Sequence, residues 1–536
     1  VELFVQRAGA VRPGFTLTTR VVDAVVALCR ALEGVPLAIE LAAARLRSLT
    51  AEELLERLDM ALSAWDGPRD LPERQRTLRA TIAWSVDLLD EAERAALAAL
   101  AVFQGAFTFD SAESVLVESG VADPAAAVAA LVDASLVGRA ADLDGDYRLL
   151  TSVRAFGSEL ATPEERERAT VAWIAHYRRV VADSAARLRG PEQLERLRAL
   201  DRESENIAAV ARTLVHRGDY EAAAEFAWSL YLYLWIGGYL GVVRALMVEL
   251  LATAPAADLA PRARAIALYY CAAVRFWQDP SFDPIPDLSE ARDLFEHDGD
   301  GAAAALAAVS IGLGWLARPL DPDGPDGSDG SDDPGGSGGS DDPDGSGGPD
   351  VPAATVEFER SLAGFRAAHD VWGQAMALVV LGRVGLALGD PTAAKARFEE
   401  SLALASAQGE RLGIVIARSH RGWTRFLLGD LAGARDDFAE SLDHSLQLRH
   451  DESIAYGLEG FVALRAVESD AGAAGRLLGV ARTLRRRKGI LNPGAFDLFA
   501  GPVQELRDRG LSAELDAAIA QGATMSVSEV LADVHD

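Results

Sequence analysis

Apolar residues recur at three- and four-residue intervals along most of the chain, with polar residues between them. This spacing places the apolar side chains on one face of a helix, so it predicts amphipathic α-helices. In the N-terminal part the expected helices cover residues 21–30, 34–45, 91–100, 124–136 and 152–160. The pattern therefore predicts an almost entirely all-α protein.

One short hairpin interrupts this helical pattern. Leu136–Arg139 and Tyr147–Leu150 have the character of two strands, and Asp144-Gly145 between them supplies a tight turn. Helices followed by a single hairpin and one more helix are typical of a winged-helix module. We expect this module at residues 86–160.

A motif repeats every 40 residues in the C-terminal half. Phe358-Glu-Arg-Ser-Leu362 recurs as Phe398-Glu-Glu-Ser-Leu402 and as Phe438-Ala-Glu-Ser-Leu442, and a further step of 40 reaches Leu478. Self-similarity at this period predicts a solenoid of helix pairs. The pattern resembles the tetratricopeptide repeat (TPR), with a unit longer than the usual length of about 34 residues.

The spacing inside one unit has a physical explanation. Gly382 on the first helix permits close approach of a second helix, and Ala394 and Phe398, four residues apart, face that contact from one side. Gly389-Asp390 ends the first helix and turns the chain. We therefore expect Phe398 to be buried and the following acid, Glu399, to face solvent.

A segment of low complexity lies within the repeats. Residues 321–350 contain only ten Asp, ten Gly, five Ser and five Pro, so they offer no apolar side chain for a core. We expect this segment to be disordered. Gly312 lies 70 residues before Gly382, which is one period of 40 plus 30. The segment is thus predicted to be an insertion inside one repeat. Its Asp residues lack the ligand spacing and closing Glu of a calcium-binding EF-hand loop.

Aromatic residues concentrate in the first part of the predicted solenoid. At helical spacing such residues are most often core, and the alternative is an aromatic-lined ligand or peptide surface on the concave face of the solenoid. The residues concerned are Phe226, Trp228, Tyr231, Tyr233, Trp235, Tyr239, Tyr269, Tyr270, Phe276 and Trp277.

Charge and composition narrow the range of partners and compartments. The formal net charge of −29 disfavours direct binding to nucleic acid or to anionic lipid, because both rely on Lys and Arg. Apolar runs are too short for a membrane-spanning helix. The start shows no secretory leader, and we interpret the chain, which opens on Val1, as a fragment or processed product. Two cysteines, Cys29 and Cys271, in apolar helical contexts favour free thiols and a cytoplasmic location.

Motifs for catalysis are missing from the sequence. A P-loop needs Gly-Lys followed by Ser or Thr, but Lys395 follows Ala394 and Lys488 follows Arg487. No His-Glu-x-x-His, Cys-x-x-Cys or Gly-x-Ser-x-Gly motif occurs, so neither a metal site nor an acyl-transfer site is expected. The basic run Arg485–Lys488 is interpreted as a solvated helix face. We expect a protein that is not an enzyme.

Several segments of the N-terminal part resemble bacterial signalling ATPases of the NB-ARC type, in the STAND class. This class includes large transcriptional regulators of the LuxR and SARP types. The resemblance covers residues 1–160 closely and the repeats more loosely. The segments that carry it are Leu3–Ala8, Gly34–Arg45, Leu71–Ile82, Trp84–Asp90 and Ala101–Phe107.

The resemblance implies a nucleotide-binding role for two residues. In the family a Gly-x-Pro proline packs against the adenine, which implies this role for Pro36. Arg154 matches a winged-helix segment that the family uses near the nucleotide. The chain lacks the Walker A and Walker B motifs, so we expect no cofactor in this chain alone, and ATP or ADP in a full-length parent. In this family the winged helix serves as an internal packing element.

These observations lead to three functional hypotheses. The first is the sensor and transducer portion of a STAND-type transcriptional regulator, whose repeats bind a small-molecule or protein effector and act on upstream nucleotide-binding and output domains. The second is a stand-alone TPR-like interaction scaffold, and the third is the regulatory end of a cyclase or kinase. The expected domains are a helical subdomain (1–85), the winged helix (86–160), TPR-like repeats (161–490) and a helical cap (491–536).

Overall fold

The computed structural model contains two compact units. It describes residues 1–13, 15–18, 21–32, 34–64, 73–140, 146–255, 259–279, 281–318, 349–488 and 498–535. The first unit comprises Val1–Val181 and Arg198–Thr213, and the second comprises Ala182–Leu197 and Leu214–Asp536. Among the described residues, no helix combines the length and the apolar character needed to cross a membrane.

The N-terminal part of the first unit is a cluster of helices around its own apolar core. Phe4, Leu28, Leu46 and Trp84 belong to this core. Helix α2 buries one face there, as the amphipathic pattern predicts, whereas α3 is buried almost all around. The elements are α1 (Glu2–Val11), α2 (Val22–Ala31), α3 (Pro36–Ala44), η1 (Arg45–Arg47), α4 (Ala51–Ala64) and α5 (Glu73–Asp87).

A winged-helix arrangement follows in the same unit. Gly138 pairs with Arg148 and Arg139 with Tyr147 in an antiparallel hairpin, as expected. The predicted turn Asp144-Gly145 lies outside the described residues. One helix, α7, was not predicted, and its N-cap Thr108 accepts a hydrogen bond from the Ser111 backbone. The elements are α6 (Glu91–Leu100), α7 (Phe109–Glu118), α8 (Pro124–Asp133), β1 (Gly138–Arg139), β2 (Tyr147–Arg148) and α9 (Thr151–Leu160).

Three helices are divided between the two units, and five more precede the regular repeats. The divided helices are α10 (Pro163–Arg187), α11 (Gln193–Arg202) and α12 (Ser204–His216). The second unit continues with α13 (Tyr220–Ser229), α14 (Tyr231–Ile236), α15 (Leu240–Thr253), α16 (Pro261–Gln278) and α17 (Ile285–Asp298). The domain boundaries expected at residues 85, 160 and 490 stay predictions.

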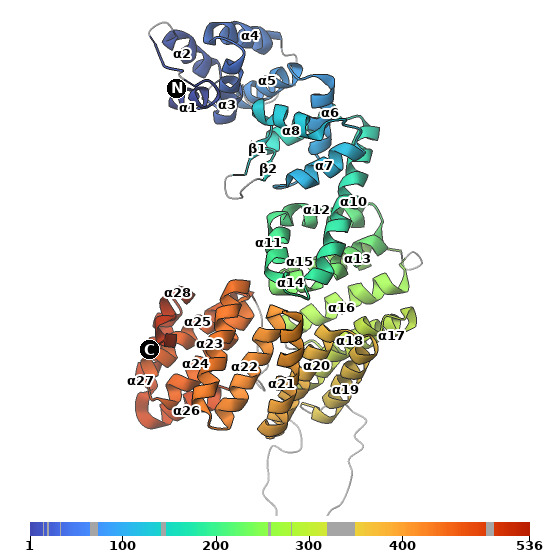
Figure 1. Cartoon of the computed structure of the whole chain (residues 1–536), viewed down its shortest axis with the longest axis vertical. Helices are drawn as coiled ribbons and strands as arrows, with labels where there is room; N and C mark the ends of the chain where they lie inside the picture. Colours follow the sequence, from blue (N-terminus) through green and yellow to red (C-terminus); the bar gives the residue numbers. More distant parts are fainter. Residues whose placement is uncertain are drawn as a thin grey trace, which may run out of the picture. The chain divides into compact units, whose positions relative to one another are not determined.

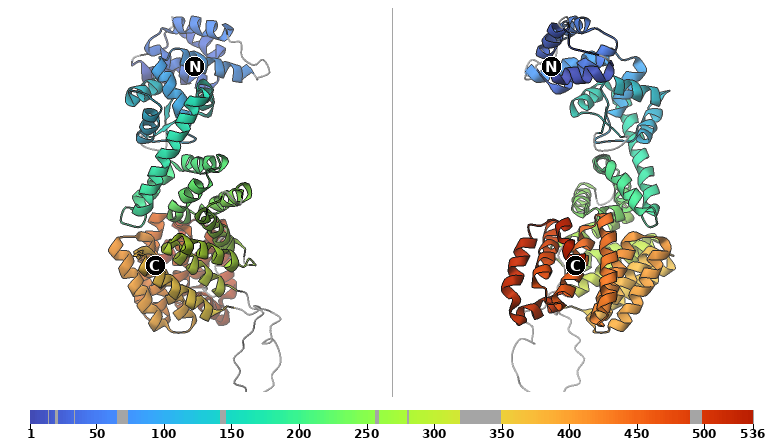
Figure 2. Two further views of the ribbon diagram at one scale, coloured as in Figure 1. Left: turned by 90° about the vertical axis from the view of Figure 1, so that its right-hand side faces the viewer. Right: turned by 60° about the vertical axis from the view of Figure 1, so that its left-hand side comes forward.

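The second unit contains the predicted helix pairs, stacked side by side (Figures 1 and 2). First helices begin at residues 371, 411 and 451, and second helices begin at 351, 391, 431 and 471, so the period is 40 in both series. The helices are α18 (Gly301–Leu316), α19 (Val351–Ala367), α20 (Val371–Ala387), α21 (Pro391–Gln408), α22 (Arg411–Leu427), α23 (Leu431–Leu448), α24 (Asp451–Val467) and α25 (Ala471–Lys488).

On the first helices α18, α20 and α22, a glycine receives the phenylalanine of the following helix. A Cβ at Gly382 would lie 2.5 Å from the Phe398 ring, and one at Gly422 would lie 2.8 Å from the Phe438 ring. Both phenylalanines are fully buried, and Glu399 is exposed. These contacts confirm the predicted packing of the repeat.

The serine of the repeated motif also joins the two helices. The Ser401 hydroxyl donates to the carbonyl oxygen of Ala375 at 2.8 Å, and the Ser441 hydroxyl donates to that of Val415 at 3.0 Å. Both serines are fully buried. A hydroxyl that bonds to a neighbouring helix avoids the cost of burying a polar group unpaired.

The insertion has the position that the repeat register predicts. Gly312 on α18 faces Phe358 on α19, as Gly382 faces Phe398. Residues 321–348 lie outside the described residues, so the expected disorder stays a prediction. Asp350 is described, and its side chain caps α19 by accepting from the backbone of Ala353 at 2.8 Å. Asp350, the last residue of the segment 321–350, thus belongs to the N-cap of α19.

Short helices pack on α25 at the C-terminal end. Glycines permit the contact, since a Cβ at Gly479 would lie 2.4 Å from the carbonyl oxygen of Ile519. The elements are α26 (Ala500–Leu506), η3 (Arg507–Leu511), α27 (Ser512–Gly522), α28 (Val527–Val530) and α29 (Ala532–His535).

Candidate functional site

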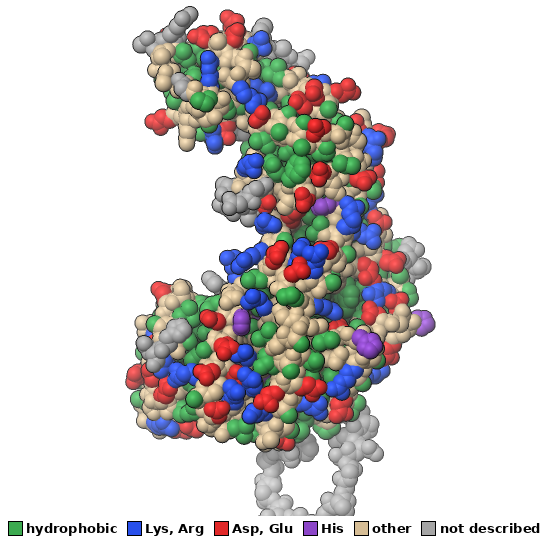
Figure 3. Space-filling model, viewed as in Figure 1, with side chains coloured by type: hydrophobic (Ala, Val, Ile, Leu, Met, Phe, Trp, Pro, Cys, Tyr) green, Lys and Arg blue, Asp and Glu red, His purple; other side chains and the backbone are tan. Residues whose placement is uncertain are grey.

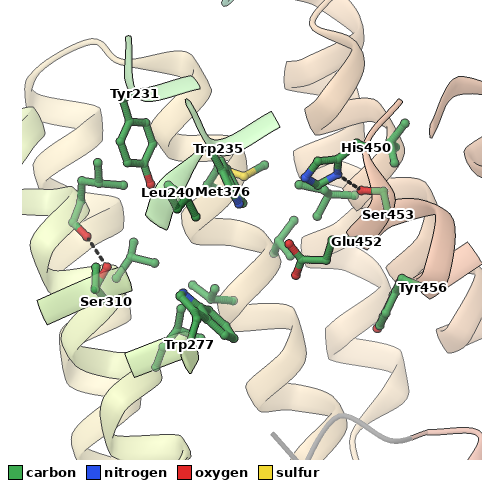
Figure 4. A pocket seen from close by; sticks show the side chains of 18 of the residues that line it. Tyr231, Trp235, Leu240, Trp277, Ser310, Met376, His450, Glu452, Ser453 and Tyr456 are labelled. Carbon is green, nitrogen blue, oxygen red and sulfur yellow. Dashed lines mark hydrogen bonds between the residues drawn. The ribbon is translucent and has the colours of Figure 1, made fainter. Parts of the chain in front are cut away.

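The second unit encloses a cavity of about 210 Å³, called the concave cavity below. Its walls come mainly from the first helices of successive pairs, α16, α18, α20, α22 and α24, with contributions from α14, α15 and α25. Figure 4 shows side chains from these helices around one space. The cavity is lined by both apolar and charged residues, which is typical of a ligand site.

Lining residues occupy equivalent positions in successive repeats. Leu306, Met376, Ile416 and Tyr456 follow one another at 70, 40 and 40 residues, so the insertion accounts for the single longer step. A second such series, at the next wall position, is Ser310, Val380 and His420. Core positions hold the same residue type in successive repeats, whereas these wall positions hold a different type in each. The sequence therefore contains a signal for the site. The signal is a set of positions that recur at the same place on each first helix but hold a different type of residue in each repeat.

One wall of the cavity is aromatic. Of the ten aromatic residues singled out from the sequence, Tyr231, Trp235, Tyr269, Tyr270 and Trp277 line the cavity, and Trp372 joins them. The Trp235 ring meets the Trp372 ring edge to face, with centroids 6.5 Å apart. The sequence left two alternatives for these ten aromatic residues, core packing or a concave surface. Half of the residues form a wall of the cavity, and the other half pack elsewhere.

The opposite wall is polar. Arg485 makes a bidentate ion pair with Glu459, at 2.7 and 2.8 Å. The expectation that the basic run is a solvated face was wrong at this residue, because Arg485 turns inward to a buried carboxylate. His450 and Ser453 share a hydrogen bond of 2.7 Å, and the Glu452 side chain points from α24 into the space opposite Trp235 (Figure 4).

Trp372 and His420 in the cavity wall each have a buried polar atom without a hydrogen-bond partner within the described residues. One is the indole N–H of Trp372, a donor, and the other is Nε2 of His420. Nδ1 of His420 lies 2.8 Å from the carbonyl oxygen of Ile416, and a donating Nδ1–H makes Nε2 an acceptor. Burial, followed by the charge of Arg383, lowers the pKa of His420 to about 3, so the ring is neutral.

The two residues that the family resemblance singled out both lie in the first unit. Pro36 is exposed at the first turn of α3, as expected for its position. Arg154 donates a hydrogen bond of 2.8 Å to the carbonyl oxygen of Gln104, in the loop after α6. The side chain of Asn206 accepts from the backbone N–H of Gln104 at 2.7 Å. Arg154 thus stabilises the loop after α6 through this hydrogen bond. The nucleotide-binding roles of Pro36 and Arg154 stay predictions.

A buried polar cluster in the first unit was missed by the sequence analysis. Ser111 donates to the Glu203 carboxylate at 2.9 Å and lies 3.0 Å from Nε2 of His176, while Tyr177 also donates to Glu203. Burial raises the pKa of Glu203 and lowers that of His176 to about 4. The residues lie far apart in the sequence, so no local motif marks them.

The winged helix has few features of a DNA-binding surface. Helix α8, the third helix of the module, contains neither Lys nor Arg in the sequence Pro124–Asp133. Asp133 at its end pairs with Arg47 at 2.5 Å. In the hairpin, Asp146 is buried, and Asp142 and Asp144 lie outside the described residues.

Other candidate chemistry is limited. The described residues include no cluster of three or more His, Cys, Asp or Glu side chains that could hold a metal ion. Cys29 and Cys271 are free and half-buried, and burial raises the pKa of Cys271 to about 11. A thiol with a raised pKa is a poor nucleophile at neutral pH.

Comparison with known proteins identifies the winged helix directly. Residues 89–161 match a family of winged helix-turn-helix domains, which agrees with the expected module. A protein of Mycobacterium tuberculosis, whose name classes it provisionally as an HTH-type transcriptional regulator, is 43% identical over 165 residues. That match covers 30% of this chain and 18% of the relative.

Further similarities are more distant or equally partial. A second M. tuberculosis protein, whose name states no function, is 40% identical over 173 residues, which cover 30% of this chain and 42% of the relative. The chain thus spans less than half of either mycobacterial protein. A STAND protein with a tetratricopeptide repeat sensor from Pyrococcus horikoshii gives a TM-score of 0.43 at 13% identity, over 90% of this chain and 74% of the other. A similarity at this level does not establish a shared fold or function.

Proposed function

We propose that this chain is the sensor and transducer portion of a STAND-type transcriptional regulator. One observation supports this most: the same chain contains a winged helix at residues 89–161 and helix pairs whose first helices line a single cavity. The effector binds in the concave cavity. The N-terminal helices and winged helix pass the signal to a nucleotide-binding part that holds ATP or ADP. The chain itself is not an enzyme and carries no cofactor.

In this proposal the winged helix contacts protein and not DNA. Binding to DNA relies on Lys and Arg that neutralise phosphates, and α8 has none. Figure 3 shows Lys and Arg side chains interspersed with Asp and Glu over the visible face of the repeats. On this face of the described residues, the mixture of signs is unlike the basic stripe typical of nucleic-acid-binding proteins, and the formal charge of −29 also disfavours binding to phosphates.

The proposal is tested by transcript profiling in the host organism. We compare the parent strain, a deletion strain, and strains whose chromosomal copy carries Trp277→Ala or Trp315→Ala. Trp277 lines the cavity, whereas Trp315 on α18, also half-buried, is not among the lining residues and stacks with Arg318. Immunoblots must show equal amounts of each variant protein.

A regulator with an effector in this cavity predicts a defined set of transcripts that change on deletion. Trp277→Ala should change the same set, and Trp315→Ala should leave it unchanged. Unaltered transcripts in the deletion strain would refute the regulatory role and favour the stand-alone scaffold. Altered transcripts on deletion with no effect of Trp277→Ala would refute the cavity as the effector site.

A further inference from the structure

The walls of the concave cavity define a chemical class of ligand, given the proposed function that makes this cavity the effector site. Tyr and Trp rings form one wall, and aliphatic side chains such as Leu240 and Met376 continue it. A ligand body that displaces water from such a surface gains free energy in proportion to the apolar area that it covers. Aromatic rings also gain from edge-to-face or offset contacts with Trp235 and Trp277, so the walls favour an apolar, ring-bearing body.

The charged side chains of the wall compensate one another. Arg485 makes a bidentate ion pair with Glu459, at 2.7 and 2.8 Å. Burial lowers the pKa of Arg485, but Glu459 and then Glu452 act in the opposite direction. Burial likewise lowers the pKa of Arg383, and Tyr456 and Glu452 oppose this effect. The two arginines are thus balanced by two glutamates. A ligand without net charge leaves this balance unchanged, whereas a charged ligand would lose its hydration shell and upset it.

His420 in the wall requires a hydrogen-bond donor from the ligand. Its side chain is only 6% exposed, and its Nδ1 lies 2.8 Å from the carbonyl oxygen of Ile416. The rings of Phe398 and Tyr456, with centroids 5.3 and 5.0 Å away, hold the imidazole in place. The neutral ring donates from Nδ1, so Nε2 is an acceptor, and it has no partner within the described residues. A ligand hydroxyl or N–H group that donates to Nε2 removes the cost of this unpaired buried atom.

Trp372 requires the opposite kind of group, a hydrogen-bond acceptor. Its side chain is 3% exposed, and its indole N–H has no hydrogen-bond partner within the part of the chain that the structure describes. The rings of Tyr231 and Trp235 meet the Trp372 ring edge to face, with centroids 6.2 and 6.5 Å away. An indole N–H can only donate, so a ligand carbonyl or ether oxygen satisfies it.

The two polar groups lie at different levels of the cavity. In the repeat register Trp372 corresponds to Leu412, eight residues before His420, which is about 12 Å along the axis of a first helix. Met376, midway between these levels, is apolar and lines the cavity. Figure 4 agrees, since Trp235, which contacts Trp372, lies above Tyr456, which contacts His420. The ligand is therefore elongated, with polar groups at its two ends and an apolar middle.

We propose that the concave cavity binds a small, uncharged, elongated aromatic molecule. An oxygen at one end accepts from the indole N–H of Trp372. A hydroxyl or N–H group at the other end donates to Nε2 of His420. The ring system between them lies along the wall of Trp235 and Trp277.

Four fluorescent probes of one skeleton test the proposal on the full chain. The reference probe is 6-propionyl-2-methylaminonaphthalene, an uncharged ketone with a secondary amine at the opposite end. Each of three analogues changes one group. A dimethylamine removes the N–H donor, a propyl group in place of propionyl removes the acceptor, and a carboxylate in its place adds a negative charge.

The probes are titrated against the parent and against variants with matched controls. His420→Phe removes the acceptor of the wall, and Trp372→Phe removes its indole donor. The control Trp423→Phe also removes a buried indole N–H without a partner, but Trp423 is not among the lining residues. The control His444→Phe changes a half-buried histidine of α23 that is likewise not a lining residue. Circular dichroism verifies that each variant is folded.

The parent should bind the reference probe at one site. It should bind the dimethylamine, propyl and carboxylate analogues each at least tenfold more weakly, which corresponds to about 1.4 kcal/mol. His420→Phe should abolish the preference over the dimethylamine and keep the preference over the propyl analogue. Trp372→Phe should do the reverse, and both controls should keep both preferences. Each readout is a ratio of affinities within one protein, so a general loss of affinity does not produce it.

The parent alone can overturn the proposal, by failing to bind the reference probe or by binding the dimethylamine and reference probes equally. Tighter binding of the carboxylate would show that the ligand is an anion. Preferences that persist in His420→Phe and Trp372→Phe would show that these side chains do not contact the ligand.

Failure of this ligand class is distinguishable from failure of the proposed function. If the probes fail but Trp277→Ala still changes the transcript set, only the ligand class is lost. If the probes behave as expected while deletion leaves the transcripts unaltered, the binding site stands and the regulatory role is lost.

Discussion

At the scale of single residues, the repeats are held together by a phenylalanine that fits against a glycine. Phe398 and Phe438 are fully buried, and Phe438 touches glycines on both neighbouring first helices, Gly422 and Gly460. The absence of a Cβ at these glycines makes room for the ring. In a solenoid each such contact acts mainly on adjacent units, because every unit packs only on its neighbours.

Truncation of these rings should destabilise the repeats locally. Phe398→Ala or Phe438→Ala should cost about 3–5 kcal/mol, because the cavity left behind adds to the lost burial. Glu399→Ala, at an exposed position one residue away, should stay within about ±0.5 kcal/mol. Urea unfolding with hydrogen exchange measures both the size and the location of the effect. Phe variants that unfold like the parent would contradict the repeat packing.

His176 should make the first unit sensitive to acid. Its pKa is lowered to about 4, first by burial and then by Arg179, whereas an unfolded histidine titrates near 6.5. The unfolded chain therefore takes up the proton first, so stability is present above pH 6.5 and is lost as the pH falls towards 4. Between pH 7 and pH 5 the loss should be about 2 kcal/mol.

The test compares the parent with His176→Gln, which cannot titrate. Urea unfolding at pH 7 and pH 5, followed by pulsed hydrogen exchange in residues 163–181, reports on the helix that carries the histidine. Between pH 7 and pH 5, the free energy of unfolding of the parent should fall by about 2 kcal/mol more than that of His176→Gln. An equal loss in both proteins would show that His176 does not cause it.

At the scale of elements, a single turn design connects the two helices of a repeat. Gly389 and Gly429 adopt positive φ of 73° and 83°, which L side chains rarely adopt. The aspartates that follow them, Asp390 and Asp430, cap the next helix by accepting from a backbone N–H three residues on. Asp350 caps α19 in the same way. The insertion therefore takes the place only of the left-handed glycine of the turn and the residues next to it.

The insertion can therefore be exchanged for the turn of the other repeats. Replacement of residues 319–349 by one glycine gives Ala317-Arg318-Gly-Asp350, which matches Ala387-Leu388-Gly389-Asp390. Because loop closure costs less for a short loop, the variant should be as stable as the parent or up to about 2 kcal/mol more stable. Thermal unfolding followed by circular dichroism measures this. A loss of helicity would mean that the segment contributes to the fold.

At the scale of the whole molecule, the 40-residue period predicted more of the fold than the local pattern of apolar residues did. The 40-residue period predicted the positions of all helices from α19 to α25, because the same core motif recurs in exact register. It also predicted that the 30-residue segment is an insertion. Helix α7 was missed, because its ten residues carry only a short apolar stripe, formed by Ala112, Val115 and Leu116.

The concave cavity could be predicted only in part. Its aromatic wall was anticipated as one of two alternatives, but its polar wall was not. Arg485 looks like part of a solvated basic run in the sequence, and only the fold brings it to Glu459, 26 residues away. Wall residues vary between repeats, so periodicity marks their positions without revealing their chemistry.

The central claim, that the concave cavity binds an effector, is tested most directly by native mass spectrometry. The full chain, Trp277→Ala and the control Trp315→Ala are each incubated with a small-molecule extract of the host and analysed without denaturation. We predict one bound small molecule per chain for the parent and for Trp315→Ala, and none for Trp277→Ala. No bound species on the parent, or the same species on Trp277→Ala at equal occupancy, would contradict the claim.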